Sequence, residues 1–396
     1  MNIASKISIK QVLIASIFLK LLVLLLMPNI NFPDCRTYMN AGTEFFEVGR
    51  ILTDNVMPLH PILSYALQYS IVIKIFNIII ATGVVYIVYR LSVAIFRDQN
   101  IAMTASIITA FYPFFIFYSI TALTETLYIF LLLCAFLLLY KKEFFFACVV
   151  IVLSILHRPT LDLLAPLLIF VFSFYVHRLG LKVSLWHVLK YALVYVVLMS
   201  PWWLHQYSKY DQFVRLNLGD GIVWYSGNNP LNTSGGGVVG SDKGDDMDLS
   251  IFSHITDPVE KNNAMKQAAF EYIKENPDRF IELAGKKFIR FWRLYPYAPQ
   301  YEKPLYIVMS LLSYGVILLL SIVYALKYLR NNFRALSPIL LLIAYFTVIH
   351  MILIGSIRYR LPLEPFLIIF ASYTIVHLLR KRSLCKCCFY FDSKST

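Results

Sequence analysis

The sequence predicts an all-α integral membrane protein, a polytopic bundle of about ten spans with one large external loop. Three observations support this fold class: long apolar runs, a low charged fraction and an uneven distribution of basic residues. Of the 396 residues, 59% are hydrophobic and only 15% are charged, whereas soluble domains are about a quarter charged. The composition therefore excludes an ordinary soluble domain.

Ten apolar runs approach or exceed the length of about 20 residues that a helix needs to cross the hydrocarbon layer. In chain order they are 9–27, 71–96, 101–118, 122–140, 144–157, 160–176, 185–204, 305–326, 337–355 and 362–379. Several runs are short, and Pro159 permits another division of 144–176, so we expect ten spans, give or take about two.

These runs divide the chain into three parts. We expect an N-terminal transmembrane bundle at 1–204, which includes a first external loop at 28–60. A large external loop follows at 205–304, and its second half reads as helix interrupted at Asn276-Pro277. The last part, 305–396, holds further transmembrane helices and a basic cytoplasmic tail. Within the first loop, the apolar spacing predicts an amphipathic helix at 37–50 on the membrane surface.

Basic residues set the expected orientation of the bundle. If the N-terminus is cytoplasmic, the cytoplasmic links and termini hold seventeen lysines and arginines. They are Lys6, Lys10, Arg90, Arg97, Lys141, Lys142, Arg178, Lys182, Lys190, Lys327, Arg330, Arg334, Arg380, Lys381, Arg382, Lys386 and Lys394. The short external links hold five: Arg36, Arg50, Arg158, Arg358 and Arg360.

The long loop is left out of this comparison because long loops translocate largely regardless of charge. The asymmetry predicts a multi-pass protein of the inner (plasma) membrane with both termini in the cytoplasm. It also accounts for the formal net charge of +13, so no nucleic-acid partner is expected, and the surrounding partners are membrane lipids.

Two acids on the expected external side are candidate catalytic residues. Asp34 follows Pro33 just beyond the first span, where a carboxylate can serve as a general base. Asp after Pro is also common in solvated turns, which is the alternative for this residue. Glu125 stands at the outer end of a span among apolar residues, where ionisable groups are costly and usually functional. The alternative is that it only marks the helix end.

Basic residues on the same side are candidates for substrate binding. Arg158 precedes Pro159, while Arg358, Tyr359 and Arg360 lie together in the segment 357–362. Arginine is normally scarce on this side, and its planar fork suits a phosphate group. His60, between Leu59 and Pro61, could contact substrate or simply begin the next helix.

Six segments, taken in order, resemble bacterial membrane glycosyltransferases of the C-type fold, in the branch of protein O-mannosyltransferases and the lipid A aminoarabinose transferase. They are Asp34 with Tyr38, Ala41 and 58–61; Leu123-Thr124-Glu125; Arg158-Pro159; 201–203 running into Gly227-Asn228-Asn229-Pro230; 272–280; and Arg358-Tyr359-Arg360-Leu361-Pro362 with 363–366. No single segment is decisive, and the ordered set covers most of the chain.

The resemblance implies an inverting glycosyltransferase that takes a sugar from a polyprenyl-phosphate donor on the outer face of the membrane. The acceptor would be a lipid, a glycan or a protein. Asp34 would be the catalytic base and Glu125 the second acid. Many relatives carry another acid directly after the first, whereas Cys35 stands here. No cofactor is therefore assigned, and a divalent metal stays an open question.

Two other functions compete with this interpretation. A polymerase or ligase of lipid-linked glycans has a similar number of spans, but would need catalytic arginines and a histidine in the large loop, whose only histidines are His205 and His254. A transporter predicts charged or broken helices at mid-membrane and two related halves. The basic residues inside the expected spans include Lys20 and Lys74, and no internal repeat is visible.

Overall fold

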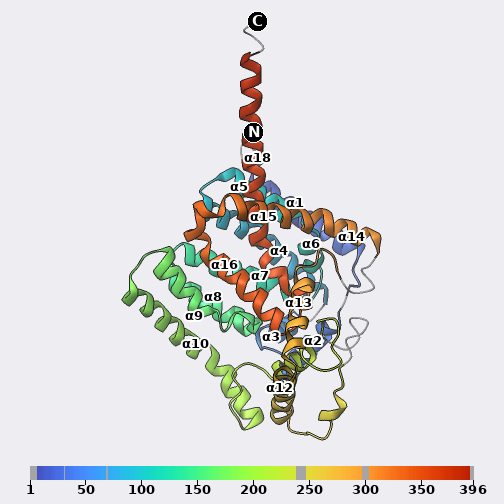
Figure 1. Cartoon of the computed structure of the whole chain (residues 1–396). Coiled ribbons are helices and arrows are strands. Elements are labelled where there is room, and N and C mark those ends of the chain that lie inside the picture. Colours follow the sequence, from blue (N-terminus) through green and yellow to red (C-terminus); the bar gives the residue numbers. More distant parts are fainter. Residues whose placement is uncertain (1–6, 31, 68–69, 238–246, 297–302, 393–396) are drawn as a thin grey trace.

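The computed structural model describes residues 7–30, 32–67, 70–237, 247–296 and 303–392, and their regular elements are helices (Figure 1). The first half holds α1 (Ile9–Leu26), α2 (Pro33–Val48), α3 (Leu59–Ala66), α4 (Ser70–Phe96), α5 (Gln99–Phe111), α6 (Pro113–Ser119), α7 (Glu125–Tyr140), α8 (Phe144–His157), η1 (Pro159–Leu161), α9 (Ala165–Phe170), η2 (Val171–Val176) and α10 (Leu181–Tyr210).

The second half holds α11 (Asp220–Gly227), η3 (Ser250–Phe252), α12 (Pro258–Glu275), α13 (Pro277–Trp292), α14 (Pro304–Ser310), η5 (Leu311–Gly315), α15 (Val316–Lys327), α16 (Leu329–Ile352), α17 (Ile357–Arg360), η6 (Leu361–Leu363) and α18 (Glu364–Asp392). The helical interruption expected at Asn276-Pro277 is confirmed as the break between α12 and α13.

Among the described residues, six helices are long and apolar enough to cross a membrane. They are α1, Ile71–Phe96, α10, Pro304–Lys327, α16 and Ile357–Lys381. The helices α5 and α6 form a seventh candidate, bent by 54°, and three further apolar helices, Glu125–Tyr140, Phe144–His157 and Ala165–Val176, are shorter. The polytopic helical class is therefore confirmed, whereas the number of ten spans is not.

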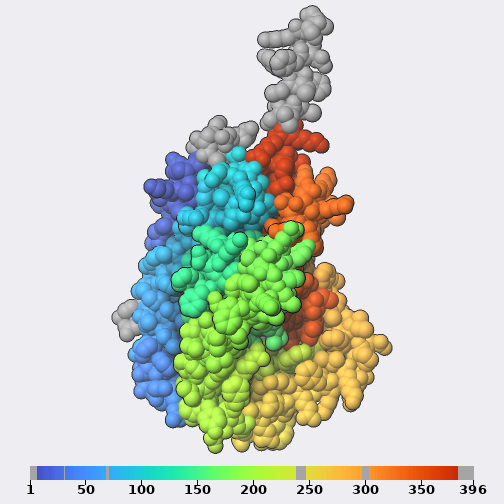
Figure 2. All heavy atoms as spheres, turned by 90° about the vertical axis from the view of Figure 1, so that its left-hand side faces the viewer, coloured from blue at the N-terminus to red at the C-terminus, as the bar shows by residue number. Residues whose placement is uncertain are grey.

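The core of the bundle surrounds α18 and α7. The helix α4 packs against α5 and α7, and α18 packs against α15 and α5. Most of the span in α18 is buried, whereas α1 and α10 expose most of theirs. Figure 2 shows α10 running along the outside of one face. Exposed apolar side chains on such outer helices are what contact with lipid requires.

Side-chain contacts gather the basic links at one end of the bundle, which we call the basic end. The contacts join His177 to the Leu139 carbonyl oxygen (2.8 Å), Arg334 to the Val176 carbonyl oxygen (2.9 Å), and Arg380 to the Asp98 carboxylate (2.7 Å). The helices α2, α3 and α12 lie at the other end, which we call the α2 end (Figure 1). The distribution of basic residues divided the links between the spans into two sets. These two sets correspond to the two ends of the bundle.

Two helices extend beyond the runs expected from the sequence. The helix expected at 37–50 begins at Pro33, so Asp34 lies in its first turn rather than in a loop. Proline is favourable at a first helical position because its missing N–H would be unpaired there anyway. The helix α10 continues to Tyr210 through the internal Pro201, beyond the expected boundary at 204.

The charge asymmetry predicts which end faces the cytoplasm. We expect reporters fused at Lys142, Lys182 and Arg334 to give cytoplasmic signals, and reporters at Gly236 and Asn262 to give external ones. The measurement is the activity of a paired cytoplasmic and external reporter in cells. An external signal at Lys142 together with a cytoplasmic one at Gly236 would reverse the orientation.

Candidate functional site

Four segments that are distant in sequence bring acids and arginines together at the α2 end of the bundle. Asp34 comes from α2, Glu125 from α7, Arg158 from the end of α8, and Arg358 from α17. We call these four residues the charge cluster. Each had been predicted as a site residue from the sequence alone.

Local sequence explains how each acid is presented. Asp34 and Glu125 both lie in the first turn of their helices. The unpaired N–H groups and the helix dipole favour negative charge at that position. Pro33 fixes the start of α2, so the carboxylate of Asp34 has a defined place at the helix entrance.

Helix ends also present the two arginines. Arg158 is the extended residue that ends α8, because the following Pro159 disfavours helical backbone in the residue before it. Arg358 lies in the short helix α17, whose N-cap residue is Ser356, and the Ser356 hydroxyl accepts a hydrogen bond from the Arg358 N–H (3.3 Å). Both guanidinium groups therefore come from breaks between helices.

Glu125 holds the cluster together. Its side chain is fully buried, and its Oε1 accepts from Arg158 Nη1 at 3.0 Å and from Arg358 Nε. Arg358 Nη1 also donates to Asp34 Oδ2 at 2.6 Å. Glu125 Oε2 has no hydrogen-bond partner among the described residues. Because a buried carboxylate is strongly unfavourable without partners, the two arginines are what makes Glu125 tolerable at this depth.

The cluster is electrically balanced and partly open. Two carboxylates face two guanidinium groups, so the formal charge of the four residues sums to zero. The Asp34 side chain is 46% exposed and that of Arg358 is 27% exposed, whereas Glu125 has no exposed surface. A substrate can therefore reach Asp34 and Arg358, while Glu125 acts from behind them.

Aromatic and imidazole rings surround the charge cluster. Tyr38 lies one helical turn after Asp34 and packs edge-to-face on His60 (4.6 Å between ring centroids), which packs on His157 in turn (5.0 Å). Burial raises the pKa of Tyr38 to about 12 and lowers that of His60 to about 4. Both side chains are therefore uncharged near neutral pH, and the arginines are left as the cations of the site.

Tyr359 supports Arg158 from the other side. The Arg158 guanidinium carbon lies 5.2 Å from the centroid of the Tyr359 ring, within the range of a cation–π contact. Tyr359 is itself stacked on His350 of α16, with ring centroids 4.6 Å apart. The structure thus places Tyr359 at the site as a support for an arginine.

Arg360 lies apart from the cluster, although it is only two residues from Arg358. It is fully buried, pairs with Glu364 at 2.9 Å, and donates to the carbonyl oxygens of Phe291 (3.0 Å) and Arg293 (2.6 Å). These carbonyls end α13, where unpaired acceptors need donors. The structure therefore does not bring Arg360, a predicted substrate contact, to the other candidates.

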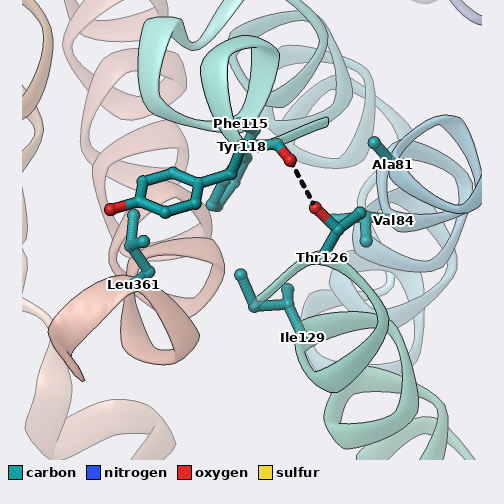
Figure 3. Close-up of a pocket in the computed structure, with 7 residues that line it drawn as sticks. All are labelled: Ala81, Val84, Phe115, Tyr118, Thr126, Ile129 and Leu361. Atoms are coloured by element: carbon teal, nitrogen blue, oxygen red, sulfur yellow. Dashed lines mark hydrogen bonds between the residues drawn. The ribbon is translucent and has the colours of Figure 1, made fainter. Parts of the chain in front are cut away.

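Two small cavities flank the start of α7. One, of about 10 Å³, is lined by apolar side chains together with Tyr118 and Thr126 (Figure 3). In it the Thr126 hydroxyl donates to the Tyr118 carbonyl oxygen at 3.1 Å, and the Tyr118 ring reaches toward Leu361. The other, of about 10 Å³, is lined by His60, Ser64 and Leu127 among others. Each is no larger than a water molecule requires, so the protein is closely packed around the start of α7.

The loop helix α13 holds the segment that leads into Arg358. The buried amino group of Lys287 donates to the Asn228 side chain and to the Ile352 carbonyl oxygen, each at 2.9 Å. Arg290 Nε donates to the Gly355 carbonyl oxygen at 3.2 Å. Gly355 must be glycine here, since an added Cβ would lie 2.4 Å from the Lys287 carbonyl oxygen. These contacts fix the backbone directly before α17.

Asp34 and Glu125 are the two acids from which a metal site would be built. Their arrangement does not fit a bound metal. The guanidinium of Arg358 already lies between the carboxylates of Asp34 and Glu125 and contacts both. Within the described ranges, no three His, Cys, Asp or Glu side chains gather in a way that could hold an ion. The electrostatics of this cluster are therefore those of its own arginines.

Sequence reasoning missed His157 and Lys287 as candidate site residues, and it named Tyr38 in the motif of Asp34 without giving it a role. The place of Tyr38 at the site could have been predicted, because Tyr38 lies four residues after Asp34 and so on the same helical face. His157 precedes Arg158, and its Nε2 lies 2.9 Å from the Thr124 carbonyl oxygen, beside Glu125. Lys287 gave no signal, since a lysine in a polar loop reads as a solvated residue.

Comparison with known proteins supports the fold. No family model and no curated protein sequence matches this chain. Two solved structures from Archaeoglobus fulgidus are similar, each with a TM-score of 0.55 and 13% identity. They are the archaeal oligosaccharyltransferase AglB in complex with an inhibitory peptide and a dolichol-phosphate, and the oligosaccharyltransferase in the apo form.

The similarity covers 98% and 97% of this chain but 52% of each of those chains, so this chain spans about half their length. The C-type glycosyltransferase fold expected from the ordered motifs is therefore confirmed at the level of fold. The particular branch of that class is not tested.

The buried Lys287 predicts a pH-dependent stability. Burial lowers its pKa to about 7, from 10.5 in an unfolded chain. Between these values the unfolded chain binds a proton that the folded chain does not, so this lysine makes folding more favourable as pH rises. The slope is at most about 1.4 kcal/mol per pH unit.

The measurement compares thermal unfolding midpoints in detergent between pH 7 and 9. Relative to Lys287→Met, the wild-type protein should gain stability across this range. Lys286→Met is the matched control, because Lys286 is partly exposed and pairs with Glu282. The difference in unfolding midpoint between Lys286→Met and wild type should stay constant over this range. If the difference between Lys287→Met and wild type is constant as well, Lys287 does not contribute a pH-dependent stability.

Proposed function

We propose that this chain is a membrane glycosyltransferase that moves a sugar from a polyprenyl-phosphate donor to an acceptor hydroxyl or amine, with inversion at the anomeric carbon. The observation that carries the proposal is the arrangement of Asp34 and Arg358. An exposed carboxylate and an arginine are in direct contact at the end of a lipid-embedded bundle. The C-type fold and the dolichol-phosphate bound by the similar AglB structure agree with a lipid-phosphate donor.

Asp34 is the proposed general base. It accepts the proton of the acceptor as the acceptor oxygen or nitrogen attacks the anomeric carbon. In the free protein, Arg358 occupies one oxygen of this carboxylate. A donor phosphate competes for the same guanidinium, so binding of the donor would release Asp34 to act as a base.

Arg358 and Arg158 are the proposed phosphate ligands. As the bond between the anomeric carbon and the phosphate oxygen breaks, the electron pair leaves with the phosphate, and fixed positive charge stabilises it. Glu125 holds both guanidinium groups through one oxygen, so they are oriented before the substrate arrives. Arg360 is omitted from this role because its donors are directed to Glu364 and to the end of α13.

The surroundings of the charge cluster suit a lipid-linked donor. The exposed apolar side chains of the outer helices, such as Leu193 and Val197 of α10, offer the lipid contact that the isoprene carrier of such a donor requires. We place this site on the external side of the plasma membrane, in agreement with the basic-residue asymmetry. The external part, 205–304, would shape the choice of a lipid, glycan or protein acceptor.

The first test is Asp34→Asn, which keeps the shape of the side chain and removes the proton acceptor. We expect transfer to fall by at least about a hundredfold, while expression and donor binding persist. Asp34→Glu should also lose activity, because a displacement of about 1 Å can cost a hundredfold. The assay is sugar transfer in membranes from a deletion strain that carries each variant.

Glu47→Gln is the matched control, since Glu47 is an exposed acid of the same helix. Glu44 is less suitable, because its carboxylate accepts from the backbone of Leu52 and Thr53 at 2.8 Å. Near-normal transfer by Asp34→Asn would remove Asp34 from the mechanism.

The second test concerns the leaving phosphate. Arg358→Ala should lower the transfer rate about a hundredfold, since loss of one charged donor to developing charge costs about 3 kcal/mol. Arg358→Lys should restore only part of the rate, because lysine cannot form the bidentate fork. Arg50→Ala, which changes an exposed arginine of the same end, should transfer normally. If Arg358→Ala retains the wild-type rate, the phosphate is bound elsewhere.

A further inference from the structure

The helix α13 exposes three large apolar side chains and buries two basic ones, although it also buries Leu283 and Phe291 and exposes Asp278 and Glu282. Ile281, Phe288 and Ile289 are 68%, 43% and 67% exposed. Lys287 and Arg290 are buried on the other side, where they bind the 352–356 segment. The sequence predicts helix in this part of the external loop, but it does not indicate which side chains of that helix are buried.

The three exposed apolar residues lie on one side of the helix, which they share with the exposed acids Asp278 and Glu282. Positions separated by seven and eight residues return to the same side of a helix. Gly285 lies between them on that side, and a Cβ built there would meet no atom of the described chain within 4 Å. We call Ile281, Phe288 and Ile289 the α13 stripe.

We propose that α13 lies in the membrane interface at the α2 end, with the α13 stripe in contact with lipid acyl chains. A helix of this kind does not span the bilayer but sinks its apolar face about 5–10 Å into the boundary between head groups and acyl chains. The α13 stripe is thus covered by the lipid of the bilayer in which the bundle itself lies.

The depth of the end of α13 supports this occupant. The Ser310 hydroxyl donates to the carbonyl oxygen of Leu294, two residues past α13, at 2.5 Å. Ser310 is the seventh residue of the candidate span Pro304–Lys327. At a rise of about 1.5 Å per residue, it lies about 9 Å inside the start of that span. The chain after α13 therefore lies at acyl-chain depth.

Neighbouring spans place the last turn of α13 at the same level. Phe291 stacks on His350, two residues before the end of the span α16, with ring centroids 5.4 Å apart. The carbonyl of Phe291 accepts from Arg360, inside the span Ile357–Lys381. Figure 1 shows α13 between α12 and the helices of the bundle.

The exposed side of the adjoining span is apolar as well. Leu305 and Leu312 of Pro304–Lys327 are 67% and 70% exposed, as the lipid-facing side of a span requires. The helix α13 thus contacts lipid on one face and fixes the backbone before Arg358 on the other.

The test uses the full-length protein in proteoliposomes that contain an alkyne-bearing phosphatidylcholine. A benzoylphenylalanine replaces Phe288 in one variant, Phe270 in a second and Leu312 in a third. Phe270 is the matched control, an aromatic residue of α12 that is 50% exposed against 43% for Phe288. Leu312 reports contact with lipid from within a span. After irradiation, lipid attached to the protein is counted by fluorescent labelling of the alkyne.

We expect Phe288 to capture lipid at a yield comparable to that of Leu312 and at least about fivefold above that of Phe270. A yield at Phe288 no higher than at Phe270, with Leu312 labelled normally, would overturn the proposal. Capture of a second protein at Phe288 in place of lipid would overturn it equally. None of these outcomes depends on whether Asp34 is a catalytic base.

Discussion

The site depends on the ion pairs that one buried carboxylate forms with two arginines. Glu125 has no exposed surface, yet it accepts from Arg158 and Arg358. Removing one partner of a buried pair typically costs about 3–5 kcal/mol, because the other charge is left without compensation. The same carboxylate therefore orders α7, the end of α8 and α17 relative to one another. The exposed Asp34 joins this arrangement through Arg358.

Most of the fold could be predicted from the sequence, because hydropathy and helix-breaking residues are local signals. Each of the ten apolar runs lies largely in helix, and the break at Asn276-Pro277 lies where proline requires it. The number of spans could not be settled in this way, since the helices α7, α8 and α9 with η2 are shorter than a full span. The length of a short helix does not show whether that helix crosses the hydrocarbon layer by itself.

The site could be predicted as a set of residues but not as an arrangement. Arg358 contacts Glu125 across 233 positions and Asp34 across 324 positions, and periodicity carries no information on such pairs. Arg358 and Arg360 looked equivalent in sequence. Residues two apart on a helix point to nearly opposite sides, so one arginine of α17 faces the acids while the other faces the core and caps α13. The two arginines have different partners because their side chains point in different directions.

The loop helix α13 changes how the external part relates to the charge cluster. From its polar sequence it would be a cover that lies over a finished site. In the structure its buried lysine and arginine bind the 352–356 backbone, and its last carbonyls receive Arg360. Arg358 is held between these two attachments, with one on each side in the chain. The position of the guanidinium therefore depends directly on Glu125, and through the backbone on α13, which holds the chain on both sides of Arg358.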